Sequence, residues 1–309
     1  KDNVALNVVN TYLNVMLNKE NLSIADIQYK FSIEQLERVK ELVAAGTQPR
    51  ANVFDAEATL ASDQQRLTVA ENNYNLALLA LSQVLQVPFE GFAVEQITLD
   101  TPSELFLYNN VNSILTHALK NRSEIKVAEK NIEAAELGKE ISRSGFYPNL
   151  SISYGLNTGA NFSNLSSDNS FFQQINDNRG HSFALSLNIP IFSRFQNKTA
   201  LAKAKIQVDN RNLALEQAKV DLESNIQRAF TDAKAALKTY VSSQKSVAAR
   251  QLSFDNAQER YNIGALNTLD LEQNRTQLVN AQSSLVRSKY DFIFKTKVLD
   301  FYLGKPLNL

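Results

Sequence analysis

The sequence predicts a mainly α fold with a small β part, in which long helices pair as antiparallel coiled-coil hairpins and one strand hairpin lies between them. Three observations predict it. Apolar residues recur every seven positions along the last helical stretch, the spacing of one seam of a left-handed coiled coil, at Leu271, Leu278, Leu285, Phe292 and Leu299. An equal stripe runs earlier, through Val53, Leu60, Leu67, Tyr74 and Leu81. Between the stripes, over residues 146–192, the apolar period changes to two, which is typical of strands.

The two stripes belong to an internal repeat. An offset of 218 residues (264 − 46 = 218) carries Gly46 onto Gly264 without a gap. Glycine suits the left-handed position that ends many helices, so we expect both glycines to mark equivalent turns between paired helices. The repeat therefore predicts two helical hairpins, residues 1–87 and 193–309.

The positions of glycine and proline indicate where the connecting segments lie. The first hairpin is expected to bend at residues 46–50 and to end at Pro88. Residues 88–111 predict a connection, of which residues 93 to about 110 are expected to be irregular or in short extended structure, and a helix is expected over residues 112–145. The second hairpin contains a helix near residues 197–262, which at about 1.5 Å per residue would be on the order of 100 Å long.

Residues 146–192 predict a strand hairpin. Apolar residues alternate with small or polar ones in two stretches, each close to the roughly 9–11 residues that cross a membrane in barrel proteins. Residues 157–182 are rich in Asn, Ser, Asp and Gly and predict an exposed external loop. Within this loop, Phe171 and Phe172 either cover the mouth of a barrel or are disordered.

The composition argues against several function classes. The 32 basic and 32 acidic residues cancel, so a nucleic-acid partner is not expected. There is no cysteine, and His117 and His181 are far apart in sequence, so no metal site and no cofactor are expected. No serine or carboxylate is paired with a histidine, or set in a glycine-rich turn, in the way that hydrolysis or phosphate binding requires, which predicts no catalytic residue and no enzyme. No run of about 18 apolar residues could cross a bilayer as a helix.

Several segments together resemble TolC-like outer-membrane efflux proteins, the outer membrane factors. The first is His-Ala-Leu-Lys-Asn-Arg-Ser-Glu-Ile at 117–125, followed by an alanine-rich helix and Phe-Tyr-Pro-Asn-Leu at 146–150. The others are Leu-Ser-Leu-Asn-Ile-Pro-Ile-Phe at 185–192, and Arg-Tyr-Asn-Ile-Gly at 260–264 with Leu-Asp-Leu at 269–271. The resemblance covers essentially the whole chain, and the combination is more specific than any one motif.

The resemblance implies a homotrimer in the outer membrane of a Gram-negative bacterium. The helical hairpins would form a periplasmic tunnel, an α-barrel, and the strand hairpins a membrane β-barrel in contact with outer-membrane lipid. Residues 88–111 would be the equatorial connection, and residues 112–145 the helix that rises to the barrel. The implied partners are a periplasmic adaptor (membrane fusion) protein and an inner-membrane transporter, in tripartite efflux or type I secretion. The protein would be a passive exit duct gated at its periplasmic tip.

The chain departs from this pattern at its start. Lys1 aligns with Lys219, so the first repeat has no counterpart of residues 104–218, which predict a rising helix and a strand hairpin. Three such chains would supply six strands, below the roughly eight of the smallest membrane barrels. We expect the sequence to be a fragment of a longer chain, which the intact mass of the native protein would test.

The resemblance places the gate near Gly264. Asp270 matches an acidic residue of the tunnel constriction, and Gln273 stands where a second aspartate would be. Tyr261 matches a tyrosine that ties the inner helix pair to its neighbour, and Asn52 stands where the acidic partner would be, so the tie would be a neutral hydrogen bond. A threefold ring of Asp270 carboxylates would favour cations. Alternatively, Asp270 is a residue that the helix dipole favours at a helix N-terminus, and Tyr261 is a packing residue.

The two turns are expected to form the surface that the adaptor contacts. Its predicted residues are Gly46, Thr47, Gly264, Ala265 and Leu266. Because Asp270 and Tyr261 have no like counterpart in the first repeat, the second hairpin is the expected gate and the first the expected fixed wall.

A soluble coiled-coil scaffold with a small β-hairpin domain is the alternative function. Heptads and helix length suit it equally well. The apolar and polar strand faces favour the membrane channel. Recovery of the full-length protein from the soluble fraction without detergent would favour the scaffold.

Overall fold

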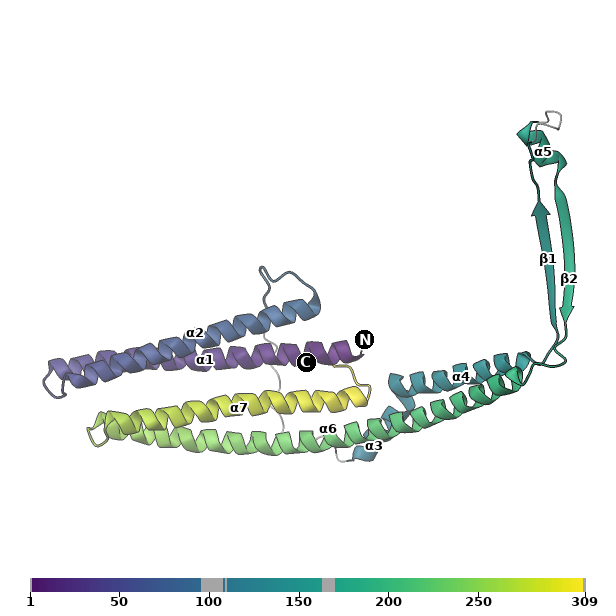
Figure 1. Ribbon diagram of the computed structural model, residues 1–309. Helices are drawn as coiled ribbons and strands as arrows, with labels where there is room; N and C mark the ends of the chain where they lie inside the picture. Colours follow the sequence, from purple (N-terminus) through teal and green to yellow (C-terminus); the bar gives the residue numbers. More distant parts are fainter. Residues whose placement is uncertain (1, 96–107, 109, 163–169, 308–309) are drawn as a thin grey trace. The chain divides into compact units, whose positions relative to one another are not determined.

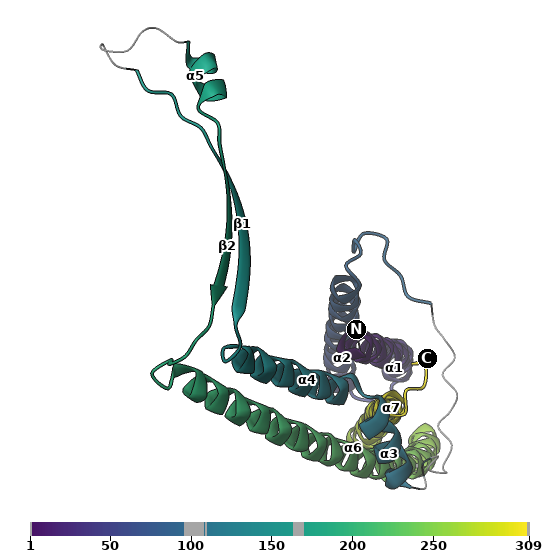
Figure 2. The same cartoon turned by 90° about the vertical axis from the view of Figure 1, so that its right-hand side faces the viewer.

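The computed structural model describes residues 2–95, 108, 110–162 and 170–307 (Figure 1, Figure 2). The elements are, in order, α1 (Asp2–Ala44), α2 (Ala51–Leu85), α3 (Val111–Asn121), α4 (Ser123–Ser144), β1 (Asn149–Asn157), α5 (Phe171–Asp177), β2 (Gly180–Asn188), α6 (Gln196–Asn262) and α7 (Thr268–Tyr302). The predicted fold class is confirmed, because the described residues are mainly α-helical and contain one two-stranded antiparallel sheet.

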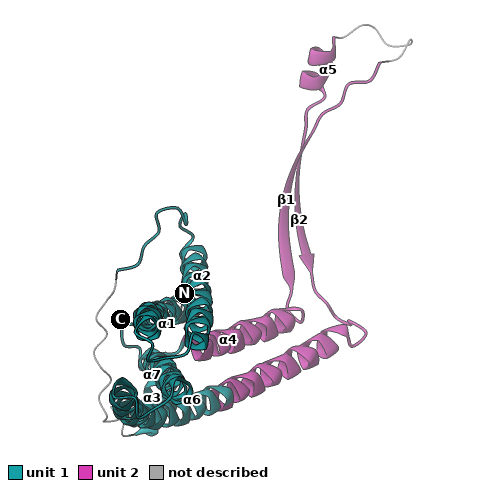
Figure 3. Ribbon diagram, turned by 90° about the vertical axis from the view of Figure 1, so that its left-hand side faces the viewer, with its two compact units in different colours: residues 1–122, 221–309 teal, residues 123–220 magenta. Residues whose placement is uncertain are grey.

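The chain divides into two compact units (Figure 3). Unit 1, residues 1–122 with 221–309, contains two antiparallel helical hairpins, α1 with α2 and the later part of α6 with α7. The hairpins meet where α1 packs against α7, and both turns lie at the same end of the unit (Figure 1). A heptad stripe is buried only against a partner helix, which explains the pairing. A core in the described part of this unit is formed by Val9, Tyr12, Leu13, Val15, Met16, Ala77, Leu78, Leu81, Val286, Tyr290 and Ile293.

Unit 2, residues 123–220, contains the sheet. β1 and β2 pair antiparallel, with Asn149 opposite Asn188. The register places apolar residues opposite one another on one face, in the pairs Leu150–Leu187, Ile152–Leu185 and Tyr154–Phe183. These six side chains are 55–81% exposed. Within the described part of the chain this apolar face is therefore uncovered, which is typical of a surface that contacts another protein or a membrane.

The helix expected over residues 112–145 is in fact two helices. Arg122, between α3 and α4, has extended backbone with φ −66° and ψ 138°. Its guanidinium lies 4.2 Å from the ring centroid of Phe301 on α7, a cation–π contact made at the point where α3 ends. A contact between residues so far apart in sequence leaves no local signal, so the predicted single helix was wrong at this point.

The loop expected over residues 157–182 contains a short helix. The side chain of Ser170 accepts a hydrogen bond from the N–H of Gln173 and caps α5, on which Phe171 and Phe172 lie with ring centroids 5.5 Å apart. Residues 96–107 and 109 of the expected connection, and 163–169 of the loop, lie outside the described residues. The assignment of segments to tunnel, equatorial connection and membrane stays a prediction.

Candidate functional site

Both turns of unit 1 end their first helix with the same hydrogen bonds. The N–H of Gly46 donates to the carbonyl three residues before it, and the N–H of Thr47 donates to the carbonyl five residues before it, at 3.0 Å each. Gly264 and Ala265 make the same two bonds, at 3.0 and 2.8 Å. The φ angles of Gly46 and Gly264 are +76° and +75°, in the left-handed region. Both glycines thus end their helices in a Schellman motif, as the repeat implies.

The turns differ where the next helix begins. The side chain of Asn267 accepts a hydrogen bond from the N–H of Asp270 at 2.8 Å and caps α7. At the start of α2, Arg50 makes no side-chain cap. Asp270 is half-buried in the first turn of α7, where the helix dipole favours a carboxylate, and Gln273 is exposed on the next turn.

Tyr261 and Asn52 are held by different neighbours. Tyr261 is 7% exposed and packs against Ala257 and Leu271 inside its own hairpin. Its hydroxyl is buried and has no hydrogen-bond partner among the described residues. Asn52 donates from its side-chain amide to Gln48 at 3.2 Å. The hydrogen-bonded tie between Tyr261 and Asn52 is not formed within the described chain, and a tie to a neighbouring copy stays a prediction.

The residues predicted to contact an adaptor lie on both turns. Four of the five are exposed, namely Gly46, Thr47, Gly264 and Ala265, and Leu266 is half-buried. Two large apolar residues beside them escaped the sequence reasoning. Ile263 and Leu269 are 80% and 77% exposed. The second turn thus presents apolar side chains to its surroundings.

A buried cluster of charged and polar residues joins the two hairpins behind the turns, and the sequence did not reveal it. Arg275 of α7 donates from Nη1 to Asp63 of α2 at 2.8 Å and to Ser32 of α1 at 3.0 Å. Arg275, Asp63 and Ser32 are 5%, 2% and 4% exposed, and they are called the buried polar layer below. Nε and Nη2 of Arg275 contact Glu272 at 2.8 and 2.7 Å. Arg66 contacts the other oxygen of Asp63 at 3.2 Å.

Charge balance explains how this cluster can be buried. Two guanidinium groups, of Arg275 and Arg66, face two carboxylates, of Asp63 and Glu272. Desolvation raises the pKa of Glu272, while Arg275 lowers it in part. Buried charges are tolerated when they are paired and hydrogen-bonded, which is the case here.

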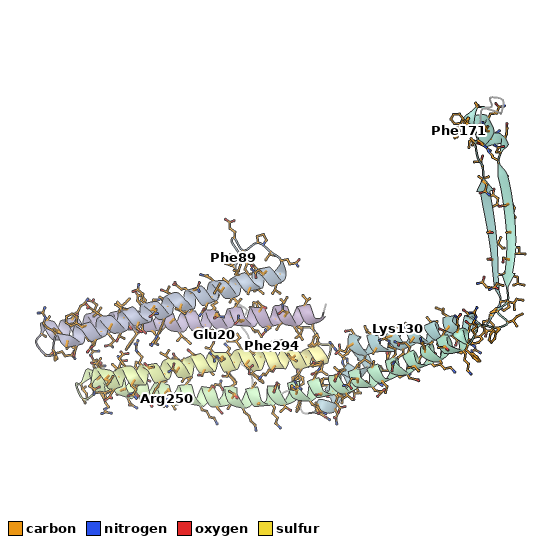
Figure 4. The ribbon with its side chains drawn as sticks, viewed as in Figure 1. Glu20, Phe89, Lys130, Phe171, Arg250 and Phe294 are labelled. Atoms are coloured by element: carbon orange, nitrogen blue, oxygen red, sulfur yellow. The ribbon has the colours of Figure 1, made fainter. Side chains whose placement is uncertain are left out.

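A second polar contact lies further from the turns. It involves Glu20 of α1, which is labelled in Figure 4. The carboxylate of Glu20 accepts hydrogen bonds from Lys289 and Tyr290 of α7, at 2.7 Å each. A cavity of about 310 Å³ between α1, α2 and α7 is lined on α7 by Val279, Ser283 and Arg287. Along α7, these lining residues fall between Arg275 and Lys289. The seam between the hairpins is thus polar toward the turns.

Neither a metal site nor a membrane-spanning helix is found in the part of the chain that the structure describes. No group of three or more His, Asp or Glu side chains there could hold a metal ion. None of the described helices is long and apolar enough to cross a membrane.

Comparison with known proteins gives one family. The model of the family described as outer membrane efflux protein matches residues 114–305. The pyoverdine export outer membrane protein OpmQ of Pseudomonas aeruginosa is 23% identical over 284 residues, which are 91% of this chain and 56% of that protein. Outer membrane protein TolC of Escherichia coli K12 is 21% identical over 305 residues, 97% of this chain and 61% of that protein. The chain spans less than two thirds of the length of these relatives.

Solved structures of outer-membrane proteins share the fold. The outer membrane protein VceC of Vibrio cholerae matches 99% of this chain and 71% of its own, with a TM-score of 0.75 and 19% identity. The CmeC outer membrane channel of Campylobacter jejuni matches 98% of this chain and 62% of its own, with a TM-score of 0.69 and 19% identity. At such identities the likeness shows the fold alone.

Proposed function

The chain belongs to the outer membrane efflux protein family, and on that premise we propose that it forms the wall of an outer-membrane exit duct. One observation carries the proposal. The same chain combines paired helices, one of them 67 residues long, with a strand hairpin whose apolar face is exposed. Long helical hairpins suit the wall of a tunnel, and an apolar strand face of nine residues suits a bilayer.

The duct is a homotrimer in this proposal, located in the outer membrane of a Gram-negative bacterium. Large apolar side chains on α4 and α6 support assembly, since Leu137, Ile141 and Leu213 are 61%, 72% and 69% exposed. Further copies of the chain would remove such surface from water. Ile263 and Leu269 on the second turn support contact with a periplasmic adaptor, and through it coupling to an inner-membrane transporter in efflux or type I secretion.

Transport through such a duct requires no chemistry on the substrate. The proposed gate is the tip of the second hairpin, where three copies of Asp270 form a carboxylate ring around the threefold axis. A ring of carboxylates in a narrow pore favours cations and repels anions. Opening consists of moving these tips apart, driven by the partner complex.

Ion conduction tests this proposal. The full-length protein, purified in detergent and inserted into planar bilayers, is expected to form cation-preferring channels. Asp270→Ala is expected to weaken the cation preference and to change the conductance, whereas Glu71→Ala, which removes an exposed carboxylate of α2, is expected to change neither. Unchanged selectivity and conductance in Asp270→Ala would contradict the gate. Recovery of the full-length protein without detergent would contradict the channel itself.

A further inference from the structure

The seam between the two hairpins changes in character along its length. Away from the turns it is an apolar core that contains residues of α1, α2 and α7, among them Leu13, Leu78 and Ile293. Closer to the turns it contains the buried polar layer of Arg275, Asp63 and Ser32. A ring contact continues this layer to α6, because Phe31 lies 5.8 Å from Phe254 between ring centroids.

The contacts of the buried polar layer oppose separation of α7 from the first hairpin. Arg275 is bonded to α1 through Ser32 and to α2 through Asp63, and its guanidinium carbon lies 5.5 Å from the ring centroid of Phe31. Pulling α7 away would leave Asp63, which is 2% exposed, without its buried cationic partner Arg275. Loss of one partner from a buried charged pair is strongly destabilising.

The part of the second hairpin beyond this layer has a core of its own. Ala257, Tyr261 and Leu271 are buried together, with Phe254 and Leu266 packed against them. In the described part of the chain, every member of this cluster belongs to the second hairpin. α7 extends from Arg275 to its start at Thr268, seven residues or about 10 Å. Phe254, whose ring also contacts Phe31 of α1, lies where this cluster meets the layer, so the tip beyond Phe254 can move as one piece.

We propose that the buried polar layer is the fixed end of the gate, which stays closed while the tip of α6 and α7 moves against the first hairpin. The inference rests on the proposed function, since it assigns a hinge to that gate. The contacts of a latch break when a gate opens, whereas the contacts of the buried polar layer stay formed. The moving part would contain Asp270 and Gly264, and the fixed part everything from Arg275 onward along α7.

Distances between spin labels test the fixed end directly. The chain has no cysteine, so introduced thiols are labelled without background. Ile27→Cys with Thr276→Cys places exposed labels beside the layer, on α1 and α7, and Thr47→Cys with Ala265→Cys places them on the two turns. Ala265→Cys with Thr276→Cys is the matched control inside the second hairpin. Labelled full-length chains are diluted with unlabelled ones, and distances are measured by double electron–electron resonance.

If the buried polar layer is the fixed end, the distance distribution is expected to be narrow for the pair at positions 27 and 276 and broad for the pair at positions 47 and 265. The control pair, at positions 265 and 276, is expected to give a narrow distribution. Arg275→Met is expected to broaden the 27–276 distribution. Equal breadth at 27–276 and 47–265 in the unmodified background would overturn the inference, and so would narrow distributions at both. The conductance of the same protein is measured in a separate experiment. A protein with the expected distances that conducts no ions would overturn the proposed function and, with it, the gate.

Discussion

The two helical hairpins share the geometry of their turns but differ in the chemistry around them. Gly46 and Gly264 adopt the same backbone and make the same hydrogen bonds. The correspondence extends to the far helix ends, where Gln86 and Gly304 are both left-handed, with φ of 56° and 67°. A left-handed conformation is strained for Gln86, which has a Cβ, but not for Gly304. The two repeats therefore end this helix with the same backbone conformation even where the residue is not glycine.

The side chains of the two repeats have diverged. α7 has a capped start and buries nine described residues, whereas α2 starts without a side-chain cap and buries five. The reason is position, because α7 packs against both α6 and α1 while α2 packs mainly against α1. The two repeats thus share their backbone conformation at a few helix-end positions. The helices that pack around each repeat decide how many of its side chains are buried.

The largest expected effect is loss of Arg275, which the first repeat does not contain. Arg275→Met is expected to lower the free energy of unfolding by about 3 kcal/mol, because Asp63 stays buried without its main partner. The double variant Arg275→Met/Asp63→Leu is expected to recover most of this loss. Urea unfolding followed by circular dichroism measures both. Arg250→Met, which removes an exposed arginine bonded to Gln277, is the control with little expected effect. A double variant as unstable as the single would contradict this account.

The next effect concerns the turn glycines. Gly46→Ala and Gly264→Ala are each expected to cost about 1–2 kcal/mol, because a Cβ at positive φ is strained. Equal losses are expected, since nothing lies within 4 Å of the added Cβ at either site. Gly138→Ala inside α4 is the matched control, where alanine is expected to stabilise by up to about 1 kcal/mol. Unfolding curves that show a loss at one turn only would refute the equivalence.

A smaller effect on stability is expected from the N-cap of α7, which the first turn lacks. Asn267→Ala is expected to cost about 1 kcal/mol, because the N–H of Asp270 loses its acceptor. Pro49→Ala, at the equivalent position of the first turn, removes no side-chain cap. Hydrogen exchange of the Asp270 amide is the measurement, and exchange as slow as in the unmodified protein would argue against the cap.

A smaller effect is expected at the buried hydroxyl of Tyr261. Tyr261→Phe is expected to leave the free energy of unfolding within about 1 kcal/mol of the original or to raise it, because the hydroxyl has no hydrogen-bond partner among the described residues. The equivalent position of the first repeat is Val43, already apolar. Thermal unfolding of the assembled protein decides the point. A clear loss of stability would instead support a partner in a neighbouring copy.

The smallest effect is a pH dependence in the second repeat. Burial raises the pKa of Glu272 above 4.5, so the folded chain holds this proton more tightly than the unfolded chain. Its contribution to stability is therefore present at low pH and lost as pH rises through 4.5 toward the folded value. Glu272→Gln is expected to gain stability relative to the original as pH increases from acid to neutral. A difference that does not change with pH would show that the carboxyl is not desolvated.

One member of the buried polar layer, Asp63, left a signal in the sequence that was not recognised. Small residues recur every seven positions along α2, at Ala56, Ala70 and Ala77, and Asp63 occupies the position missing from this series. A charged residue at a seam position indicates a buried partner, but the heptad does not say which one. The missed break at Arg122 has a similar cause, because its aromatic partner Phe301 is on another helix.

The sequence by itself determined the helical hairpins, the glycine turns and the two faces of the strand hairpin. These follow from local periods and from backbone preferences, which act between residues a few positions apart. Only the tertiary structure decided which side chains meet across the seam. Arg275 is 212 residues from Asp63 and 243 from Ser32, and no local pattern specifies such pairs. The turns where the sequence predicted a gate are thus joined to the rest of unit 1 by contacts that exist only after the two repeats pack together.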